Sequence, residues 1–243
     1  MTRFIFKQDE EEEEKMELLM QPEFWSALLA IIVIDLVLAG DNAIVIGMAA
    51  RNLPAEQQKK AIVWGTVGAI IIRALATLAV VWLLKIPGLL LVGGLILMWI
   101  ALKLLVSDDG HENMKASGSL GAAIWTIIVA DTVMGLDNVI AVAGAAHGDF
   151  LLVIIGLVIS VPIMVWGSTL ILKVMERFPI VIYIGAGVLA YTAASMVTTE
   201  KFLVPFFTAY PWVKWVFIVA VVVGVLLIGR MKSQQQKRLA EQN

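Results

Sequence analysis

The octapeptide Asp35-Leu-Val-Leu-Ala-Gly-Asp-Asn42 lies inside an apolar run that extends from Phe24 to Ala50. A second octapeptide, Asp131-Thr-Val-Met-Gly-Leu-Asp-Asn138, lies inside another apolar run, from Leu120 to Ala146. The offset between them is 131 − 35 = 96 residues, and it aligns both acids and the amide of one copy with those of the other. Two acids and an amide, placed twice in apolar surroundings, do not form a solvated surface. They indicate a polar site that is surrounded by apolar segments of the chain.

The composition predicts a helical membrane protein. The 243 residues are 60% apolar and 16% charged, whereas about a quarter of the residues in a soluble domain are charged. Several apolar windows exceed the roughly 18 residues that mark a membrane-spanning helix. The chain has no cysteine and two histidines, which excludes disulfides and thiolate sites and argues against an imidazole-rich site for copper or zinc. The net charge of −2 gives no sign of nucleic-acid binding.

We therefore expect an all-α, polytopic membrane protein with about seven transmembrane helices. The expected spans are 24–49, 61–84, 87–106, 120–146, 150–174, 179–198 and 212–230. Spans 1–3 resemble spans 4–6 beyond the octapeptides, because the stretch from Pro87 to Gly94 matches Pro179 to Ala186 at a similar offset, 179 − 87 = 92. Since three is an odd number, the two copies enter the membrane from opposite sides. This is the inverted-repeat plan of many transporters.

The expected organisation has six parts. They are an acidic extracytoplasmic tail (1–23), membrane repeat 1 (24–106), a cytoplasmic loop (107–119), membrane repeat 2 (120–198), a seventh transmembrane helix (212–230) and a cytoplasmic tail (231–243). The first tail lacks the basic start and apolar stretch of a signal peptide. Its acidic run before Met16 resembles a translated ribosome-binding site, so Met16 is an alternative start. Lysine and arginine are more frequent in the loops on one side, which places the N-terminus outside and the C-terminus in the cytoplasm.

The motif aspartates need a compensating charge. At about 1.5 Å per residue, Asp35 and Asp131 both lie near the middle of a roughly 30 Å apolar core, where two antiparallel spans allow them to meet. A charged aspartate costs about 2.5–3.5 kcal/mol at that depth. Bound cations, bound protons or Arg73, the one strongly basic residue deep in a span, must offset this cost. Arg73 is therefore either a counter-charge or a side chain that reaches the membrane surface.

Helical phase predicts a site made of oxygen ligands. Asp35 and Asn42 are seven residues apart and share one helical face, whereas Asp41 points elsewhere on a straight helix. Gly40, and Gly135 in the second copy, offer places where the helices can unwind and expose carbonyl groups. Carboxylate, amide and carbonyl oxygens suit hard divalent ions such as Mn²⁺, Mg²⁺ or Ca²⁺. The candidate metal ligands are Asp35, Asp41, Asn42, Asp131, Asp137 and Asn138.

Other polar and small residues in the spans have ordinary structural explanations. Pro162 lies inside a span and predicts a kink. The glycine groups at 93–94 and 185–187 indicate close helix packing. Hydroxyl side chains within spans commonly bond between helices, and this is expected of Thr66, Thr77, Ser160, Ser168, Thr192 and Ser195.

At its two octapeptides the chain resembles the TerC family of integral membrane proteins, and within it the short bacterial branch without an appended soluble domain. The resemblance covers about 24–230. It implies a LysE-like transporter in the bacterial plasma membrane that exports Mn²⁺, with the six motif residues along the ion pathway. No resident cofactor and no catalytic residue are expected. The expected partners are the transported ion and the lipid bilayer, and the sequence leaves the oligomeric state open.

Three interpretations follow. The first is a secondary transporter, driven by a gradient because the chain has no Gly-x-x-x-x-Gly-Lys-Ser/Thr nucleotide loop; proton exchange on the same carboxylates is one option. The second is an intramembrane aspartyl protease, which needs only one pair of aspartates and leaves the asparagines and the duplication unexplained. The third is a non-transporting membrane partner that supports metalation of secreted proteins. A flux measurement separates the first from the third.

Overall fold

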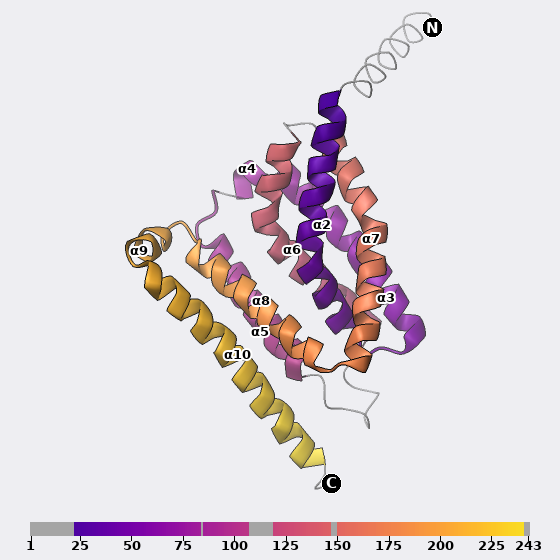
Figure 1. Cartoon of the computed structure of the whole chain (residues 1–243), viewed down its shortest axis with the longest axis vertical. Coiled ribbons are helices and arrows are strands. Elements are labelled where there is room, and N and C mark those ends of the chain that lie inside the picture. Colours follow the sequence, from indigo (N-terminus) through magenta and orange to yellow (C-terminus); the bar gives the residue numbers. More distant parts are fainter. Residues whose placement is uncertain (1–21, 84, 107–118, 147–149, 241–243) are drawn as a thin grey trace, which may run out of the picture.

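The structure is a computed structural model that describes residues 22–83, 85–106, 119–146 and 150–240 (Figure 1). Its helices are α2 (Pro22–Ala50), α3 (Ala55–Leu78), α4 (Val80–Leu83), α5 (Leu89–Val106), α6 (Leu120–Ala145), α7 (Phe150–Arg177), α8 (Ile180–Thr198), α9 (Val204–Ala209) and α10 (Pro211–Ala240). No strand occurs in these ranges, so the predicted all-α fold is confirmed. Residues 1–21 of the acidic tail, His111 and His147 lie outside the described residues.

The helices have the length and surface of a polytopic membrane protein. Five of them, α3, α5, α7, α8 and α10, are long and apolar enough to cross a membrane. In α2 and α6, which carry the octapeptides, the apolar stretches found among the described residues are shorter, Phe24–Val33 and Leu120–Leu136. Large apolar side chains cover the outer surface: Trp64, Trp125 and Trp166 are 62%, 68% and 70% exposed. Such a surface suits lipid rather than water.

The second span differs from its prediction. We expected a loop up to Lys60 and a helix over 61–84, but α3 begins at Ala55 and ends at Leu78. Residues 55–60 are Ala, Glu, Gln, Gln, Lys and Lys, all of them good helix formers, so the helix starts before the apolar run does. Pro54 takes the cap position, and Glu56 in the first turn suits the positive end of the helix dipole. Hydropathy located the span but not the helix start.

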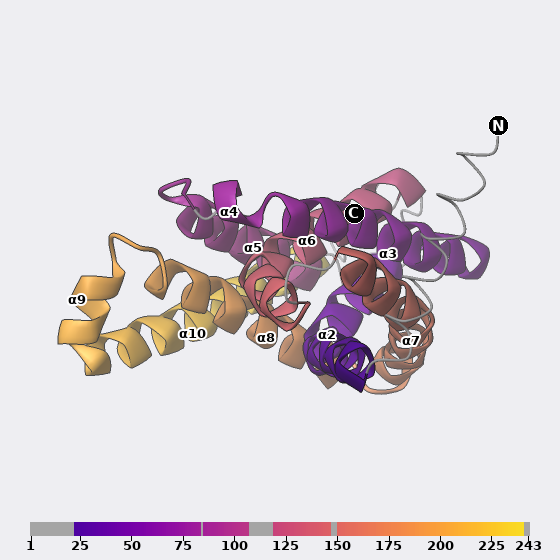
Figure 2. The same ribbon diagram turned by 90° about the horizontal axis from the view of Figure 1, so that it is seen from above.

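The last helix and the proline-containing helix also extend the sequence-based description. α10 continues to Ala240, through the residues that we expected to form a tail after 230. α7 runs through Pro162 as one helix of 28 residues. In Figure 2, α9 and the start of α10 lie to one side, away from α2, α3 and α7. α10 packs mainly on α8 and α5 and so forms the flank of the molecule.

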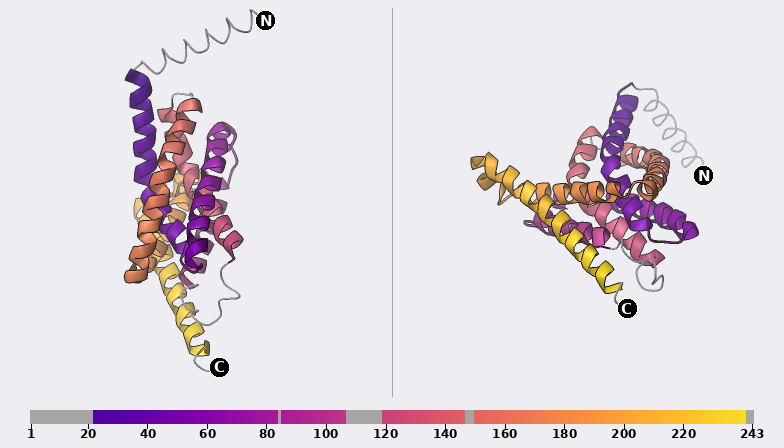
Figure 3. Two further views of the ribbon diagram at one scale, coloured as in Figure 1. Left: turned by 90° about the vertical axis from the view of Figure 1, so that its right-hand side faces the viewer. Right: turned by 60° about the horizontal axis from the view of Figure 1, so that its bottom comes forward.

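The helix pairs follow the predicted duplication. α2 packs against α7, α3 packs against α6, and α5 packs against α8. In the duplication α2 corresponds to α6, α3 to α7 and α5 to α8. When each helix is replaced by its counterpart, the α2–α7 contact becomes the α6–α3 contact, and the α5–α8 contact stays the same. α2 and α6 also touch, and they run in opposite directions (Figures 1 and 3). This is the pairing that an inverted repeat produces.

Glycine contacts give the register between the halves. A Cβ atom at Gly65 of α3 would lie 2.8 Å from Ile127 of α6, and one at Gly156 of α7 would lie 2.5 Å from Ile31 of α2. The two isoleucines are 127 − 31 = 96 residues apart, the offset of the octapeptides, and the two glycines are 156 − 65 = 91 apart. Residues of α3 therefore correspond to residues of α7 that lie 91 positions later.

Hydroxyl hydrogen bonds give the same register. The Thr77 hydroxyl donates to the carbonyl of Arg73 at 2.9 Å, and the Ser168 hydroxyl donates to the carbonyl of Met164 at 2.6 Å. Both offsets are 91 residues, since 168 − 77 = 91 and 164 − 73 = 91. These hydroxyls, and that of Ser160, bond within their own helices. The expectation that they bond between helices was wrong for these three residues, because the carbonyl one turn earlier is nearer.

The small residues mark close helix packing, as predicted. A Cβ atom at Gly94 of α5 would lie 2.6 Å from the carbonyl oxygen of Ala193 in α8. At Gly185 of α8, a Cβ atom would collide with Ile44 and Met48 of α2. In apolar surroundings, where burial of apolar surface gives little drive to helix association, such close approach supplies the packing contacts.

Candidate cation-binding site

A buried ion pair joins α3 to α6. Arg73 Nη2 lies 2.6 Å from Asp131 Oδ1, and each side chain is 2% exposed. At this burial the two charges interact through surroundings of low dielectric, where the loss of one partner costs about 3–5 kcal/mol. Of the two roles considered for Arg73, the structure shows the counter-charge. Asp131 is thereby paired at the place where the second octapeptide begins.

Gly135 of α6 lies beside this arginine. A Cβ atom there would lie 3.4 Å from Arg73 Nε and 3.9 Å from its Cγ. α6 is unbroken from Leu120 to Ala145, so the expectation that it unwinds at Gly135 was wrong. Both distances are ordinary van der Waals contacts, so Arg73 packs beside this position of α6 without requiring a glycine there.

The first octapeptide brings a second carboxylate to the same region. Asp41 of α2 is half-buried and interacts electrostatically with both Asp131 and Arg73. Its Oδ1 accepts a hydrogen bond of 2.9 Å from the backbone N–H of Asn42. Residues of α2, α3 and α6 thus converge, with Asp41 and Asp131 as the interacting carboxylates, whereas the predicted meeting of Asp35 with Asp131 stays a prediction, because the Asp35 side chain is outside the described part of the structure.

α2 is also unbroken, from Pro22 to Ala50. The expected unwinding at Gly40 was therefore wrong. In apolar surroundings each freed backbone group costs several kcal/mol, about the value of an unmade hydrogen bond in hydrocarbon, which favours the intact helix. Helical carbonyl groups are used within their own helix, so the ligands that this stretch offers are side-chain oxygens.

Asn42 has an unsatisfied buried side chain. It is 1% exposed, and neither its Oδ1 nor its Nδ2 has a hydrogen-bond partner among the described residues. The hydroxyl of Thr132, the residue after Asp131, is buried in the same state. Leaving a buried polar group unpaired costs about 1–3 kcal/mol. Two such groups, each adjacent in sequence to a motif carboxylate, indicate a site whose ligand is needed to satisfy it.

Three of the predicted ligands are placed by their backbone only. Asp35 lies in α2, and Asp137 and Asn138 lie in α6, but their side chains are outside the described part of the structure. Among the described side chains, no three histidine, aspartate or glutamate residues gather as a metal site. Asp41 and Asp131 are thus the two predicted carboxylates whose surroundings are known.

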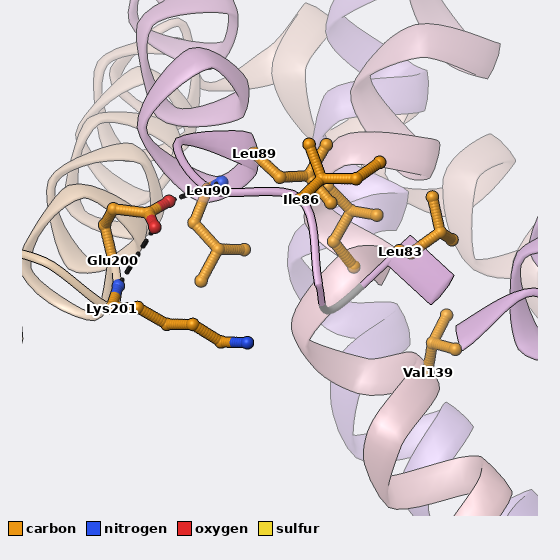
Figure 4. Close-up of a pocket in the computed structure, with 8 residues that line it drawn as sticks. Leu83, Ile86, Leu89, Leu90, Val139, Glu200 and Lys201 are labelled. Atoms are coloured by element: carbon orange, nitrogen blue, oxygen red, sulfur yellow. Dashed lines mark hydrogen bonds between the residues drawn. The ribbon is translucent and has the colours of Figure 1, made fainter. Parts of the chain in front are cut away.

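Glu200, a residue that we did not single out, caps α5. It is 2% exposed, although it lies just after α8 and beside Lys201. Its Oε2 accepts from the backbone N–H groups of Leu90 (3.0 Å) and Leu91 (3.3 Å), and Oε1 accepts from that of Lys201 (3.0 Å). Figure 4 shows the bonds from Leu90 and Lys201. Burial alone would raise the pKa of this carboxyl, but backbone N–H donors, including that of Gly88, lower the pKa below its ordinary value.

A small pocket of about 40 Å³ lies beside this cap. It is lined by Leu83, Ile86, Leu89, Leu90, Leu136, Val139, Glu200 and Lys201 (Figure 4). Leu136 and Val139 flank Asp137 and Asn138 in the chain, so the pocket adjoins the end of the second octapeptide. In sequence, an acid next to a lysine at the end of a span looks like a solvated loop charge. Only the tertiary contact with the start of α5 distinguishes it.

The comparisons with known proteins agree with the motifs. A family model described as the integral membrane protein TerC family matches residues 20–237. The uncharacterized membrane protein YjbE of Bacillus subtilis (strain 168) is 44% identical over 218 residues, which cover 90% of this chain and 100% of that protein. The family match extends over both halves and most of α10.

More distant relatives share a smaller part. The uncharacterized membrane protein YkoY of Bacillus subtilis (strain 168) is 25% identical over 213 residues, 74% of this chain and 65% of that protein. The UPF0053 inner membrane protein YgdQ of Escherichia coli (strain K12) is 28% identical over 177 residues, 65% of this chain and 74% of that protein. No solved structure matches the chain.

Proposed function

This chain belongs to the TerC family of integral membrane proteins, and from that premise we propose that it is a secondary transporter exporting a hard divalent cation, preferably Mn²⁺, across the bacterial plasma membrane. The observation that carries the proposal is the electrostatic interaction of Asp41 with Asp131 across the two halves, next in sequence to the buried and unsatisfied Asn42 side chain. A cation between the halves would satisfy the amide oxygen and use the carboxylates.

The chemistry of the site favours hard ions. The six motif residues, Asp35, Asp41, Asn42, Asp131, Asp137 and Asn138, offer carboxylate and amide oxygens and no sulfur or imidazole. Carboxylate and carbonyl ligands select Mg²⁺, Ca²⁺ and Mn²⁺ over copper or zinc. The choice of Mn²⁺ among these, and the outward direction of transport, come from the family resemblance.

Transport by this fold would use its two halves. The motif helices α2 and α6 touch each other, and each packs on the second helix of the other half. A shift of one half against the other would open the site first to one side of the membrane and then to the other, as in other inverted-repeat transporters. The energy would come from an ion gradient.

We place the N-terminus outside and the C-terminus in the cytoplasm. In Figure 1 the N-terminal end of α2 and the C-terminal end of α10 lie at opposite ends of the molecule. Among the described residues, the helix ends and connections on the side of the C-terminus carry Arg51, Lys59, Lys60, Lys103, Lys173, Arg177, Arg230 and Lys232, whereas those on the opposite side carry Lys85, Lys201 and Lys214. The positive-inside rule assigns the richer side to the cytoplasm.

Metal flux into proteoliposomes tests the proposal. Purified wild type should carry Mn²⁺ across the membrane, and Asp35→Asn, Asp41→Asn and Asp137→Asn should each lower the rate by about tenfold or more, because each removes a ligand charge while keeping the side-chain shape. Glu176→Gln, which neutralises an exposed acid at the end of α7, is the matched control and should transport like wild type. Unchanged flux in all three variants would exclude these aspartates from the pathway. No flux from folded wild type would favour a non-transporting partner.

A further inference from the structure

The two halves differ at one buried position. The 91-residue register between α3 and α7, given by Gly65 and Gly156 and by the hydroxyl bonds, places Met164 where the first half has Arg73. Met164 is 1% exposed and belongs to an apolar cluster with Leu28 and Ile31 of α2. In the first half, the buried positive side chain of Arg73 therefore contacts α6 of the other half. The corresponding residue of the second half, Met164, is neutral.

A second position differs in step with the first. The octapeptide offset of 96 residues aligns Gly135 of α6 with Ala39 of α2, since 135 − 39 = 96. Gly135 lies beside Arg73, with Nε 3.4 Å from where a Cβ atom would be, which is an ordinary contact distance. At these two aligned positions the halves therefore differ in sequence, with Arg73 and Gly135 on one side and Met164 and Ala39 on the other.

The asymmetry makes the two leading aspartates of the motifs unequal. Asp131 is already paired with a guanidinium group at 2.6 Å. Asp35 stands at the same register in α2, but the α7 position that corresponds to Arg73 carries no charge. A divalent cation that approaches Asp131 is repelled by Arg73. Because it carries two charges, this repulsion is twice that between two unit charges at the same distance. The cation and Arg73 therefore compete for Asp131.

We propose that Arg73 is a tethered competitor of the transported cation: it occupies Asp131 in the empty site and must leave Asp131 when the cation binds. The inference rests on the proposed function and adds a residue that sets affinity. Because the pair joins α3 of one half to α6 of the other, its release loosens a contact between the halves. Arg73 thereby couples binding of the cation to movement between the halves, because the Arg73–Asp131 pair has two arrangements, formed and broken.

The test exchanges residues between corresponding positions. Arg73→Met with Gly135→Ala removes the competitor, Met164→Arg with Ala39→Gly adds one in the other half, and the combination of all four moves it from one half to the other. Arg73→Lys keeps the charge and is the conservative control. Binding of Mn²⁺ to purified full-length protein in detergent is measured at neutral pH from the electron paramagnetic resonance signal of the free ion.

We expect removal of the competitor to tighten Mn²⁺ binding on the order of tenfold, and addition of a second one to weaken it by a similar factor. Arg73→Lys and the four-residue exchange should stay within about threefold of wild type. Removal of Arg73 should also lower the melting temperature of the metal-free protein. Addition of Mn²⁺ should then raise the melting temperature more than it does in wild type, because the metal compensates the unpaired Asp131 carboxylate.

The outcomes separate the two proposals. If wild type binds Mn²⁺ and the variant without the competitor binds it equally or more weakly, Arg73 is a structural partner only and the inference is overturned, while the transporter proposal stands. If wild type binds no divalent cation, both are overturned. If removal of Arg73 prevents folding, the variant with the added arginine decides, because binding as tight as that of wild type would contradict competition.

Discussion

At the scale of single residues, the structure assigns different roles to polar groups that look alike in the sequence. Arg73 and Asp131 form an ion pair, whereas the Asn42 side chain is buried with no described partner. An unsatisfied buried amide lowers the stability of the folded protein, and such destabilising groups are found mainly at functional sites. Asn42 is therefore the residue at which stability and function should respond in opposite directions.

We predict that Asn42→Leu stabilises the ion-free protein and impairs transport. Leucine is close to asparagine in size and removes the unpaired polar group, so the free energy of unfolding should rise by about 1–3 kcal/mol. The same change removes an oxygen ligand and should lower Mn²⁺ flux about tenfold or more. Thermal unfolding in detergent and flux in proteoliposomes measure the two effects. A less stable protein with normal flux would show that Asn42 serves packing alone.

At the scale of elements, the start of α5 depends on a residue far away in the chain. Pro87 and Gly88 turn the chain into α5, with Gly88 at a φ of 82° that suits glycine. The first N–H groups of the helix then donate to Glu200, 110 residues later than Leu90. The negative carboxylate also faces the positive end of the helix dipole. This contact fixes the end of α8 to the start of α5 beside the pocket.

The cap predicts a defined pH dependence of stability. Because the backbone donors lower the pKa of Glu200 in the folded protein, its stabilising contribution is complete above the ordinary value of 4.5 and is lost as the pH falls toward the lower folded value. Glu200→Gln should cost about 1 kcal/mol at neutral pH. The difference in melting temperature between wild type and Glu200→Gln should shrink below about pH 4.5. A difference that is the same at neutral pH and well below pH 4.5 would contradict this cap.

At the scale of the whole molecule, the duplication explains how much the sequence could predict. The 96-residue offset between the octapeptides, together with three spans per copy, predicted that α2 and α6 meet, and Asp41 and Asp131 do interact. Hydropathy and composition predicted the helical class. The helical class and the pairing of the halves depend on hydropathy and spacing averaged over long segments. Such averages change little when the helix ends are uncertain by a few residues.

The details that the sequence did not give depend on helix rotation and on contacts between distant segments. Whether Arg73 pairs with Asp131 depends on the rotation of α3 about its axis. Gly135 looked like a place where α6 could unwind, and its contact with Arg73 depends on a side chain from another helix. The cap by Glu200 depends on where a loop between helices folds back. None of these leaves a periodic pattern in the sequence.

The most direct measurement for the central claim is the location of Mn²⁺ in an experimental structure of the metal-loaded protein, from its anomalous X-ray scattering. We predict one peak between α2 and α6, within about 2.5 Å of oxygen atoms from both octapeptides, a distance typical of oxygen ligands to such cations. The same structure should show Arg73 withdrawn from Asp131. Manganese bound by one half alone, or only outside the octapeptides, would contradict a transport site formed by the two copies together.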